Sequence, residues 1–236
     1  MSVDFVLNRL SGVRPSAPRF GQAGVLVAAV ILMVLPPHPV TAQSALQVLE
    51  AASERYTALD GFCADFHQEV EVTLLRQTTT SEGELCQLPP DRFEMRFTEP
   101  SGDRVVADGT DLWVYFPSTD EGQVFRQRLG AADGRFDLHG EFLSDPGQRY
   151  RAELEGRETV NGVEAHVLML EPLLESEYRR ARVWIDVQDH LIRRLEIHDD
   201  ADSIRILELS NLRLNPDIPE GRFEFVPPSG VQVITR

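Results

Sequence analysis

The sequence predicts an α+β fold in which antiparallel sheet predominates, built as a barrel or a strongly curved sheet of about 11 to 12 strands with one N-terminal helix. Three observations lead to this prediction. Only one long segment, near residue 50, repeats apolar residues at helical spacing. From Phe62 onward apolar and polar residues alternate with a period of two. Gly, Pro, Asn and Asp interrupt that alternation about every 8 to 15 residues, as turns between short strands do.

The first 42 residues predict an export signal. Arg9, Arg14 and Arg19 precede an uninterrupted apolar run over 23–35, and Val40-Thr41-Ala42 places small residues at a signal-peptidase site. The run is shorter than the roughly 20 residues that a transmembrane helix needs. We therefore expect a signal peptide over 1–42, cleaved after Ala42, and one domain over 43–236, located in the periplasm. A lipid anchor is not expected, because the first cysteine is Cys63.

Charge excludes some classes of partner. The formal net charge is −15 at pH 7, and every basic side chain other than histidine is an arginine. A field of this sign repels phosphate backbones and anionic headgroups, so nucleic-acid binding is not expected. Membrane encounters then require a partner protein or an apolar surface.

The expected elements follow in order. Ser44-x-x-Gln47 is a capping-box signature; Leu46, Leu49, Ala52, Tyr56 and Leu59 then follow at helical spacing, and Gly61 ends the helix. A first hairpin is expected over 61–76 and 81–88, turning near Thr79. The remaining strands are predicted at Arg92–Phe97, Arg104–Ala107, Leu112–Phe116, Gln123–Leu129, Tyr150–Gly156, Ala165–Glu171, Arg180–Val187, Leu191–His198, Ser203–Leu209 and Arg222–Phe225.

Alternation within the strands separates a dry face from a wet face. Phe93, Met95 and Phe97 alternate with charged residues, which is typical of a sheet with one solvated face. Over 112–116 both faces are apolar, so both sides of that strand must be covered. We expect Trp113 and Tyr115 to pack on the N-terminal helix.

The two cysteines leave two possibilities open. An exported protein with two cysteines often joins them. A turn near Thr79, however, places Cys63 opposite about residue 95 and several residues from Cys86. In either state the role of the cysteines is structural, since the spacing is not the C-x-x-C of redox sites.

Residues 130–143 lack the strand pattern. Scattered apolar residues lie between Gly130, Gly134 and Gly140, which lower helical stability. The segment is either a short, loosely held helical lid or an ordinary surface loop.

A search for catalytic and metal-binding motifs gives no enzyme assignment. The sequence has no G-x-S-x-G elbow, no H-E-x-x-H and no glycine-rich phosphate loop. The densest polar cluster, 198–202, lies between two predicted strands and is interpreted as a hairpin turn. No cofactor and no metal are expected.

Several short motifs, in their order and spacing, resemble the periplasmic lipoprotein-carrier family LolA. The residues that carry the resemblance are Phe66-x-Gln68, Gly83-Glu84-Leu85, Pro90-x-x-Phe93, Glu99-Pro100, Asp108-Gly109-x-x-Leu112-Trp113-x-Tyr115-x-Pro117 and Phe223-x-Phe225-x-Pro227-Pro228-x-Gly230-Val231. They cover almost the whole chain after the signal.

The resemblance implies an open, incomplete β-barrel wrapped on a helix, with a short helical lid covering a hydrophobic cavity for acyl chains. It also implies a monomer that receives lipoproteins from an inner-membrane LolCDE-type exporter and delivers them to an outer-membrane LolB-type receptor. An alternative is a periplasmic carrier or sensor of another lipid (a glycolipid, a sterol-like or a polyketide lipid) on the same fold.

Two sets of side chains are the candidate site. The acyl-binding face is assigned to Phe66, Phe93, Met95, Phe97, Leu112, Val114 and Phe116. The lid contacts are assigned to Phe136, Leu138, Phe142 and Leu143. The sequence departs from the family at Pro89, where the family has an arginine that helps to hold the lid shut, and Arg92 or Arg96 is a candidate replacement.

Overall fold

The computed structural model describes residues 44–130 and 138–235. The chain divides into two units, Met1–Thr41 and Ala42–Arg236, and all described residues belong to the second unit. The predicted signal peptide and Phe136 of the predicted lid lie outside the described residues. Within the described ranges, none of the helices combines the length and the apolar character needed to cross a bilayer.

The N-terminal helix α1 spans Ala45–Thr57 and begins with the predicted capping box. The Ser44 hydroxyl accepts the Gln47 backbone N–H at 3.2 Å, and the Gln47 side chain accepts the Ser44 backbone N–H at 2.8 Å. This reciprocal pair satisfies two of the backbone donors that a helix start leaves open. The helix ends four residues before Gly61, where the chain turns into the first strand.

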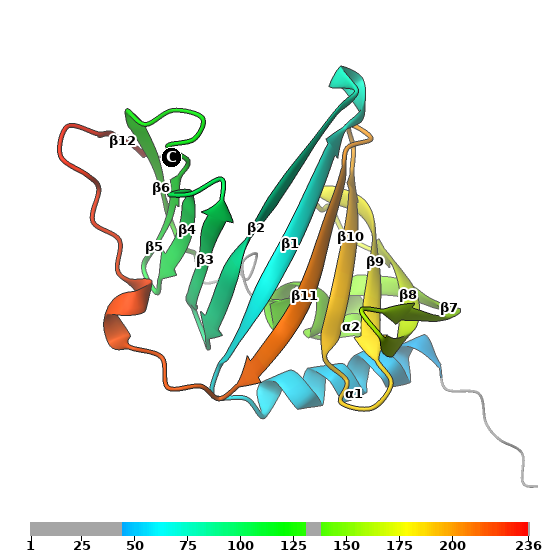
Figure 1. Ribbon diagram of the computed structural model, residues 1–236. Coiled ribbons are helices and arrows are strands. Elements are labelled where there is room, and N and C mark those ends of the chain that lie inside the picture. Colours follow the sequence, from blue (N-terminus) through cyan, green and yellow to red (C-terminus); the bar gives the residue numbers. More distant parts are fainter. Residues whose placement is uncertain (1–43, 131–137, 236) are drawn as a thin grey trace, which may run out of the picture. The chain divides into compact units, whose positions relative to one another are not determined.

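In the described part of the chain, twelve strands form one sheet that is not closed into a barrel (Figure 1). The order is β12-β6-β5-β4-β3-β2-β1-β11-β10-β9-β8-β7, and every neighbouring pair is antiparallel except β6 and β12. Two meanders, β1 to β6 and β7 to β11, therefore join along β1 and β11. The strands are β1 Phe62–Val72, β2 Gln77–Leu88, β3 Arg92–Glu99, β4 Arg104–Asp108, β5 Asp111–Tyr115, β6 Gln123–Arg128, β7 Tyr150–Val160, β8 Val163–Pro172, β9 Tyr178–Asp186, β10 Ile192–Asp199, β11 Ile204–Leu214 and β12 Gln232–Thr235.

The first hairpin corrects the predicted register. The chain turns at η1, Thr73–Leu75, and not near Thr79, because Arg76 adopts the left-handed conformation with φ 51°. The earlier turn shifts β2 so that Cys63 lies opposite Cys86, with 4.1 Å between the Cα atoms. The two cysteines form a disulfide, and the expectation that Cys63 faces residue 95 is wrong.

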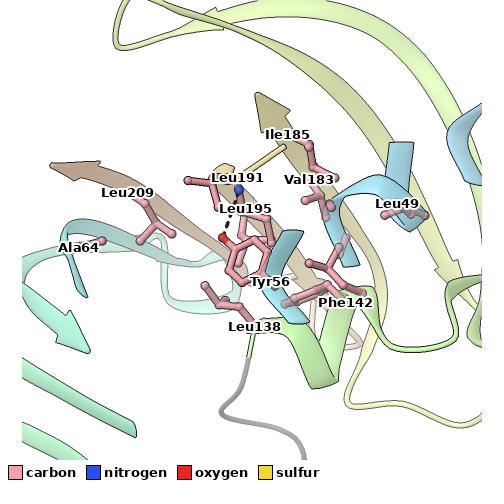
Figure 2. Packing of buried hydrophobic residues seen from close by; sticks show 14 of the residues in the cluster. Leu49, Tyr56, Ala64, Leu138, Phe142, Val183, Ile185, Leu191, Leu195 and Leu209 are labelled. Carbon is pink, nitrogen blue, oxygen red and sulfur yellow. Dashed lines mark hydrogen bonds between the residues drawn. The ribbon is translucent and has the colours of Figure 1, made fainter. Parts of the chain in front are cut away.

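The sheet has two faces, which we call inner and outer. The inner face carries Phe66, Phe97 and Leu195 and packs against α1. Figure 2 shows Leu49 and Tyr56 of α1 in one cluster with Val183 and Ile185 of β9 and Leu195 of β10. The Tyr56 hydroxyl also accepts the backbone N–H of Ile192 at 3.2 Å. One continuous core thus joins the helix to both halves of the sheet.

Among the described residues, two short helices follow β6 and contribute to this core. The π-helix η2 spans His139–Leu143 and the single-turn helix α2 spans Pro146–Arg149. Phe142 and Leu143 are buried, and His139 Nε2 lies 3.1 Å from Ser53 Oγ and 3.2 Å from Thr57 Oγ1 of α1. The end of the segment predicted as a lid or a loop therefore forms a short helix, and this helix is attached to the N-terminal helix.

The C-terminal segment covers the outer face at β3, β4 and β5. The strand predicted over Arg222–Phe225 is wrong: Glu220–Phe223 forms the 3-10 helix η3, which lies against β3 and β4. Phe223 packs on the disulfide, and the Phe225 ring lies 5.6 Å from Trp113 and 5.9 Å from Tyr115. Trp113 and Tyr115 therefore pack on this segment, which corrects the expectation that they pack on α1.

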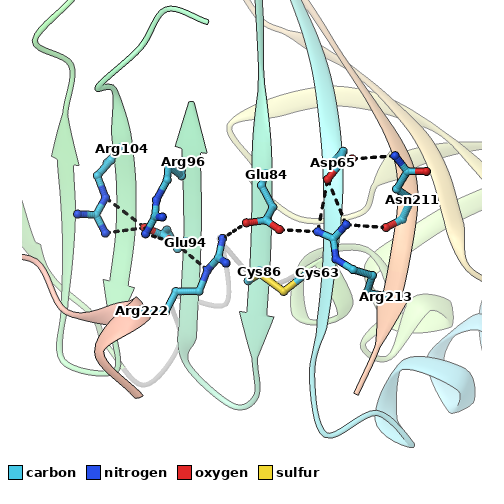
Figure 3. A network of polar contacts seen from close by, with 10 residues as sticks. All are labelled: Cys63, Asp65, Glu84, Cys86, Glu94, Arg96, Arg104, Asn211, Arg213 and Arg222. Carbon is cyan, nitrogen blue, oxygen red and sulfur yellow. Dashed lines mark hydrogen bonds and ion pairs between the residues drawn. A yellow bond between two sulfur atoms is a disulfide. The ribbon is translucent and has the colours of Figure 1, made fainter. Parts of the chain in front are cut away.

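A line of ion pairs crosses the outer face from β11 to β4 (Figure 3). Glu94 is fully buried, although alternation predicts a solvated position. Its carboxylate contacts Arg104 at 2.5 Å and Arg96 at 3.1 Å. The Nε atom of Arg222 lies 2.8 Å from Oε2 of Glu94; this contact is an ion pair, but its geometry is not that of a hydrogen bond. Covering of a polar face by a distant segment explains why the alternation mispredicts this residue.

The turn predicted at 198–202 is confirmed. The Asp199 side chain accepts the backbone N–H groups of Ala201 at 2.9 Å and Ser203 at 2.8 Å, as in an Asx turn between β10 and β11. Within residues 44–130 and 138–235, no group of three or more His, Cys, Asp or Glu side chains is arranged to hold a metal ion.

Candidate apolar face and rim cavity

The seven residues predicted to bind acyl chains all lie on the inner face. Phe66, Phe93, Phe97 and Leu112 are buried in the main core, and Met95 and Val114 pack against it. Six of the seven come from β1, β3 and β5, and Phe116 directly follows β5; alternation predicts their face because a strand turns successive side chains to opposite faces. The structure thus brings together one apolar surface from three strands.

Three aromatic rings connect this surface. The centroids of Phe66 and Phe97 lie 5.1 Å apart, and those of Phe97 and Phe116 lie 5.8 Å apart, both in edge-on contact. Phe116 is 37% exposed, so it forms the open edge of the row. Gly83 lies beneath Phe66: a Cβ at this position would meet the Arg96 carbonyl oxygen at 2.1 Å. The glycine therefore permits close contact of β2 with β3 below the aromatic row.

The described lid residues lie elsewhere on the inner face. Leu138, Phe142 and Leu143 join the same core cluster as α1, and the Phe142 ring lies 6.0 Å from that of Tyr178. The π-helix η2 thus contacts α1, and its Phe142 contacts β9. The described members of both predicted sets therefore belong to one core cluster or pack against it, apart from Phe116, which contacts the Phe97 ring.

A second feature, which we call the rim cavity, lies between η2 and the ends of several strands. It has a volume of about 510 Å³, within the range of small-molecule pockets. None of the seven predicted face residues is among the described residues that line it. Its lining consists of Val70, Gly140, Glu141, Phe142, Arg149, Tyr150, Pro172, Leu174, Glu175, Ser176, Glu177, Tyr178, Ile197, Asp199, Ser203, Ile204 and Arg205.

Hydrogen bonds attach η2 to this cavity's wall. Tyr178 donates to Oε1 of Glu141 at 2.7 Å, and Tyr150 donates to the backbone oxygen of Glu141 at 2.5 Å. The two phenol oxygens lie 2.8 Å apart. Arg149 donates to the Gly140 carbonyl and lies 3.4 Å from Oε2 of Glu141.

Burial keeps both phenols protonated. Loss of hydration raises the pKa of Tyr178 far above its ordinary value, and the neighbouring Tyr150 and Glu141 raise it further. Burial likewise raises the pKa of Tyr150. Both hydroxyls therefore remain hydrogen-bond donors at any physiological pH.

Sequence reasoning missed this cavity. Glu141, Tyr150 and Tyr178 come from three elements, and Tyr150 and Tyr178 are the first residues of their strands. Only the pairing of β7 with β8, and of β8 with β9, brings the strand ends together. The local sequence contains no signal of that juxtaposition beyond a tyrosine at each strand start.

The proposed replacement of the family arginine is also resolved in part. Arg96 contacts Glu94 on the outer face, so it does not face η2. Arg92 has the same parity on β3 and lies on the outer face as well. The described contacts of η2 come from α1, β7, β9 and Arg149, and a replacement of the family arginine by Arg92 or Arg96 stays a prediction.

An open antiparallel sheet with one apolar face and a helix across it defines the class of β-proteins that can enclose an apolar ligand. The sequence matches the family described as "Outer membrane lipoprotein carrier protein LolA" over residues 57–226. The chain therefore belongs to the LolA family, as the resemblance indicated.

Relatives and solved structures agree with this assignment. An outer-membrane lipoprotein carrier protein of Alkalilimnicola ehrlichii is 30% identical over 206 residues, which cover 86% of this chain and 91% of the relative. The corresponding protein of Legionella pneumophila is 27% identical over 204 residues, 86% of this chain and 96% of the relative. The crystal structure of an uncharacterized conserved protein from Thermus thermophilus has the same fold, with a TM-score of 0.53 at 14% identity over 81% of this chain and 99% of that chain.

Proposed function

We propose that this chain is a periplasmic carrier that holds the acyl chains of lipoproteins against the inner face of its sheet. In this proposal it takes them from an inner-membrane LolCDE-type exporter and passes them to an outer-membrane LolB-type receptor, as a monomer and without catalysis. Family membership and the names of relatives that match along most of their length support the proposal.

The single observation that carries it is the apolar inner face. The row Phe66, Phe97 and Phe116 extends from the core to an edge where Phe116 is partly exposed. An acyl chain that binds along this edge leaves water and contacts the aromatic side chains. Burial of one methylene is worth about 0.8 kcal/mol, so a 16-carbon chain amounts to about 12 kcal/mol, which makes unassisted transit through water negligible.

Two further features support a periplasmic location. We propose cleavage after Ala42, which leaves Ser44 in place to cap α1. The Cys63–Cys86 disulfide suits an oxidising compartment, since such bonds are rare in the cytosol.

The first test is mass spectrometry of the full-length protein expressed with its own leader and purified gently from the periplasm. Copurification of lipoproteins, together with a mature N-terminus at Gln43, is the expected result. Copurification of a free glycolipid, sterol-like or polyketide lipid instead would overturn the lipoprotein proposal and favour the alternative carrier.

A substitution pair locates the cargo. We expect Phe116→Glu to lower lipoprotein loading about tenfold, because a carboxylate at the edge of the row opposes burial of an acyl chain. We choose Phe116 as the site of substitution because it is partly exposed, whereas Phe93 is buried and a charge there would disturb folding. Val226→Glu, an 82% exposed site on the C-terminal segment, adds the same charge elsewhere and should load normally. Equal loading of the two variants would exclude the aromatic row as the cargo surface.

A further inference from the structure

The rim cavity combines an apolar floor with a charged rim. Phe142 and Ile197 connect its floor to the main core, and Val70 and Ile204 extend that floor. Polar and charged residues of η2, α2, β7, β9, β10, β11 and the neighbouring loops line the rest. A cavity of this kind fits the junction between an apolar chain and a polar head better than it fits a purely apolar or a purely polar ligand.

The charge of the cavity lining determines which polar head groups of an amphiphile can bind there. The lining contains four carboxylates and two guanidinium groups, which gives it a formal charge of −2. The charged residues are Glu141, Glu175, Glu177, Asp199, Arg149 and Arg205. A negative lining attracts cations and repels carboxylate or phosphate heads, and the effect is larger in a partly enclosed site than in open water.

Glu141 is the carboxylate best placed to meet such a head. Its side chain is only 18% exposed, and Tyr178 fixes its Oε1 atom from β9. Oε2 has a contact with Arg149 at 3.4 Å, which is long for a charge-assisted hydrogen bond, while Arg149 donates to the Gly140 carbonyl. A carboxylate offers about four acceptor positions, and these contacts occupy two. Glu141 therefore retains acceptor capacity beside the cavity.

We propose that the rim cavity is a subsite for the cationic head of an amphiphile, with Glu141 as the acceptor of an ammonium N–H. The inference rests on the proposed carrier function, and it adds a preference for the polar part of the cargo. Two sources supply this chemistry: the free α-amine of a diacylated lipopeptide and the ethanolamine of a phospholipid.

The test compares amphiphiles that share one chain. Dodecylammonium, dodecanoate and dodecanol, each below its micellar concentration, compete with a fluorescent apolar probe for the full-length mature protein at pH 7. We expect dodecylammonium to bind about tenfold more tightly than dodecanoate, with dodecanol between them. Equal affinity for the two ions, or preference for dodecanoate, would overturn the subsite.

A matched pair of variants assigns the effect to Glu141. Glu141→Gln keeps an oxygen that accepts from Tyr178, so η2 should stay in place, and it should lower dodecylammonium affinity about tenfold while leaving dodecanol unchanged. Glu224→Gln makes the same charge change at an exposed site on the C-terminal segment and should leave all three affinities unchanged. An unaltered ammonium preference in a folded Glu141→Gln protein would overturn the assignment.

Two further ligands identify the source of the ammonium. A diacylated lipopeptide with a free α-amine that binds more tightly than its N-acetylated form supports a lipoprotein source, and tight binding of lysophosphatidylethanolamine supports a phospholipid source. If neither amine is preferred, the subsite is wrong. If dodecanol binds without any charge preference, the subsite fails while the carrier function stands; if no amphiphile binds, both fail.

Discussion

The phenol of Tyr178 donates to the carboxylate of Glu141 across 2.7 Å, and this bond joins β9 to the π-helix η2. Tyr150 adds a second bond from β7 to the backbone of the same residue. Burial holds both phenols in their protonated form. The position of η2 over the rim cavity therefore depends on two strand-borne tyrosines.

Removal of one hydroxyl should loosen η2. We expect Tyr178→Phe to lower the free energy of unfolding by about 1 to 2 kcal/mol, because Glu141 loses a buried donor. Guanidinium unfolding measures the change, and hydrogen exchange of residues 139–143 should quicken. Tyr115→Phe is the control: the Tyr115 hydroxyl makes a 3.3 Å contact with the Glu121 carbonyl at the surface, and its loss should cost about 0.5 kcal/mol or less. Equal losses in the two variants would contradict the attachment of η2 through Tyr178.

The buried Glu94 should be the most sensitive carboxylate on the outer face. Glu94→Gln leaves Arg104, Arg96 and Arg222 without their shared anion, and we expect a loss of about 3 to 5 kcal/mol in the free energy of unfolding. Glu171→Gln, in an exposed pair with Arg151, should cost less than about 1 kcal/mol. Chemical denaturation of both proteins at one ionic strength makes the comparison. A Glu94 variant as stable as the Glu171 variant would show that the outer network contributes little.

Local patterns predict much of this fold. The capping box at Ser44 predicts where α1 begins, and alternation predicts nine of the ten strands listed after the first hairpin, because both signals lie within a few neighbouring residues. The inner face is predictable for the same reason: Phe93, Met95 and Phe97 share a parity that any β-strand converts into a face.

The wrong or missing predictions concern features that depend on residues far apart in the sequence or on rare backbone conformations. The first turn is marked by Arg76 at φ 51°, which the sequence does not signal because non-glycine residues seldom adopt that conformation. The burial of Glu94 requires Arg222, 128 residues later in the chain, to reach β3. The rim cavity likewise forms between the ends of strands that lie far apart in the sequence and come together only through the pairing of the sheet.

The disulfide should stabilise the β1–β2 hairpin. Cys63 and Cys86 close a loop with a sequence separation of 23, and the chain-entropy relation gives about 3 kcal/mol for such a loop. We expect the double variant Cys63→Ala, Cys86→Ala to lose about that amount in the free energy of unfolding. The unmodified protein unfolded with a thiol reductant should show the same loss, and the double variant should not respond to the reductant. If the reductant also lowered the stability of the double variant, the loss seen in the unmodified protein could not be assigned to the disulfide.

Asp186 should make stability depend on acid pH. Burial opposes its ionisation, but the Gln188 backbone N–H at 2.7 Å and the Arg193 guanidinium at 2.6 Å outweigh that effect and hold the pKa of Asp186 below its ordinary value of 3.8. A lowered pKa in the folded state means that ionised Asp186 stabilises the protein above pH 3.8 and loses this contribution as the pH falls through the folded-state pKa.

The comparison of Asp186→Asn with the unmodified protein tests whether the stabilisation by Asp186 is lost as the pH falls. At pH 7 we expect the variant to be less stable by about 2 kcal/mol, because the bonds to Arg193 and Gln188 lose a charged acceptor. In urea unfolding at pH 7, 5 and 3, the gap should be constant between pH 7 and 5 and should narrow at pH 3. Asp200→Asn, at an exposed turn position, should differ little from the unmodified protein at each pH. A gap that keeps its size at pH 3 would mean that Asp186 stabilises the turn through its shape and hydrogen bonds, and not through its charge.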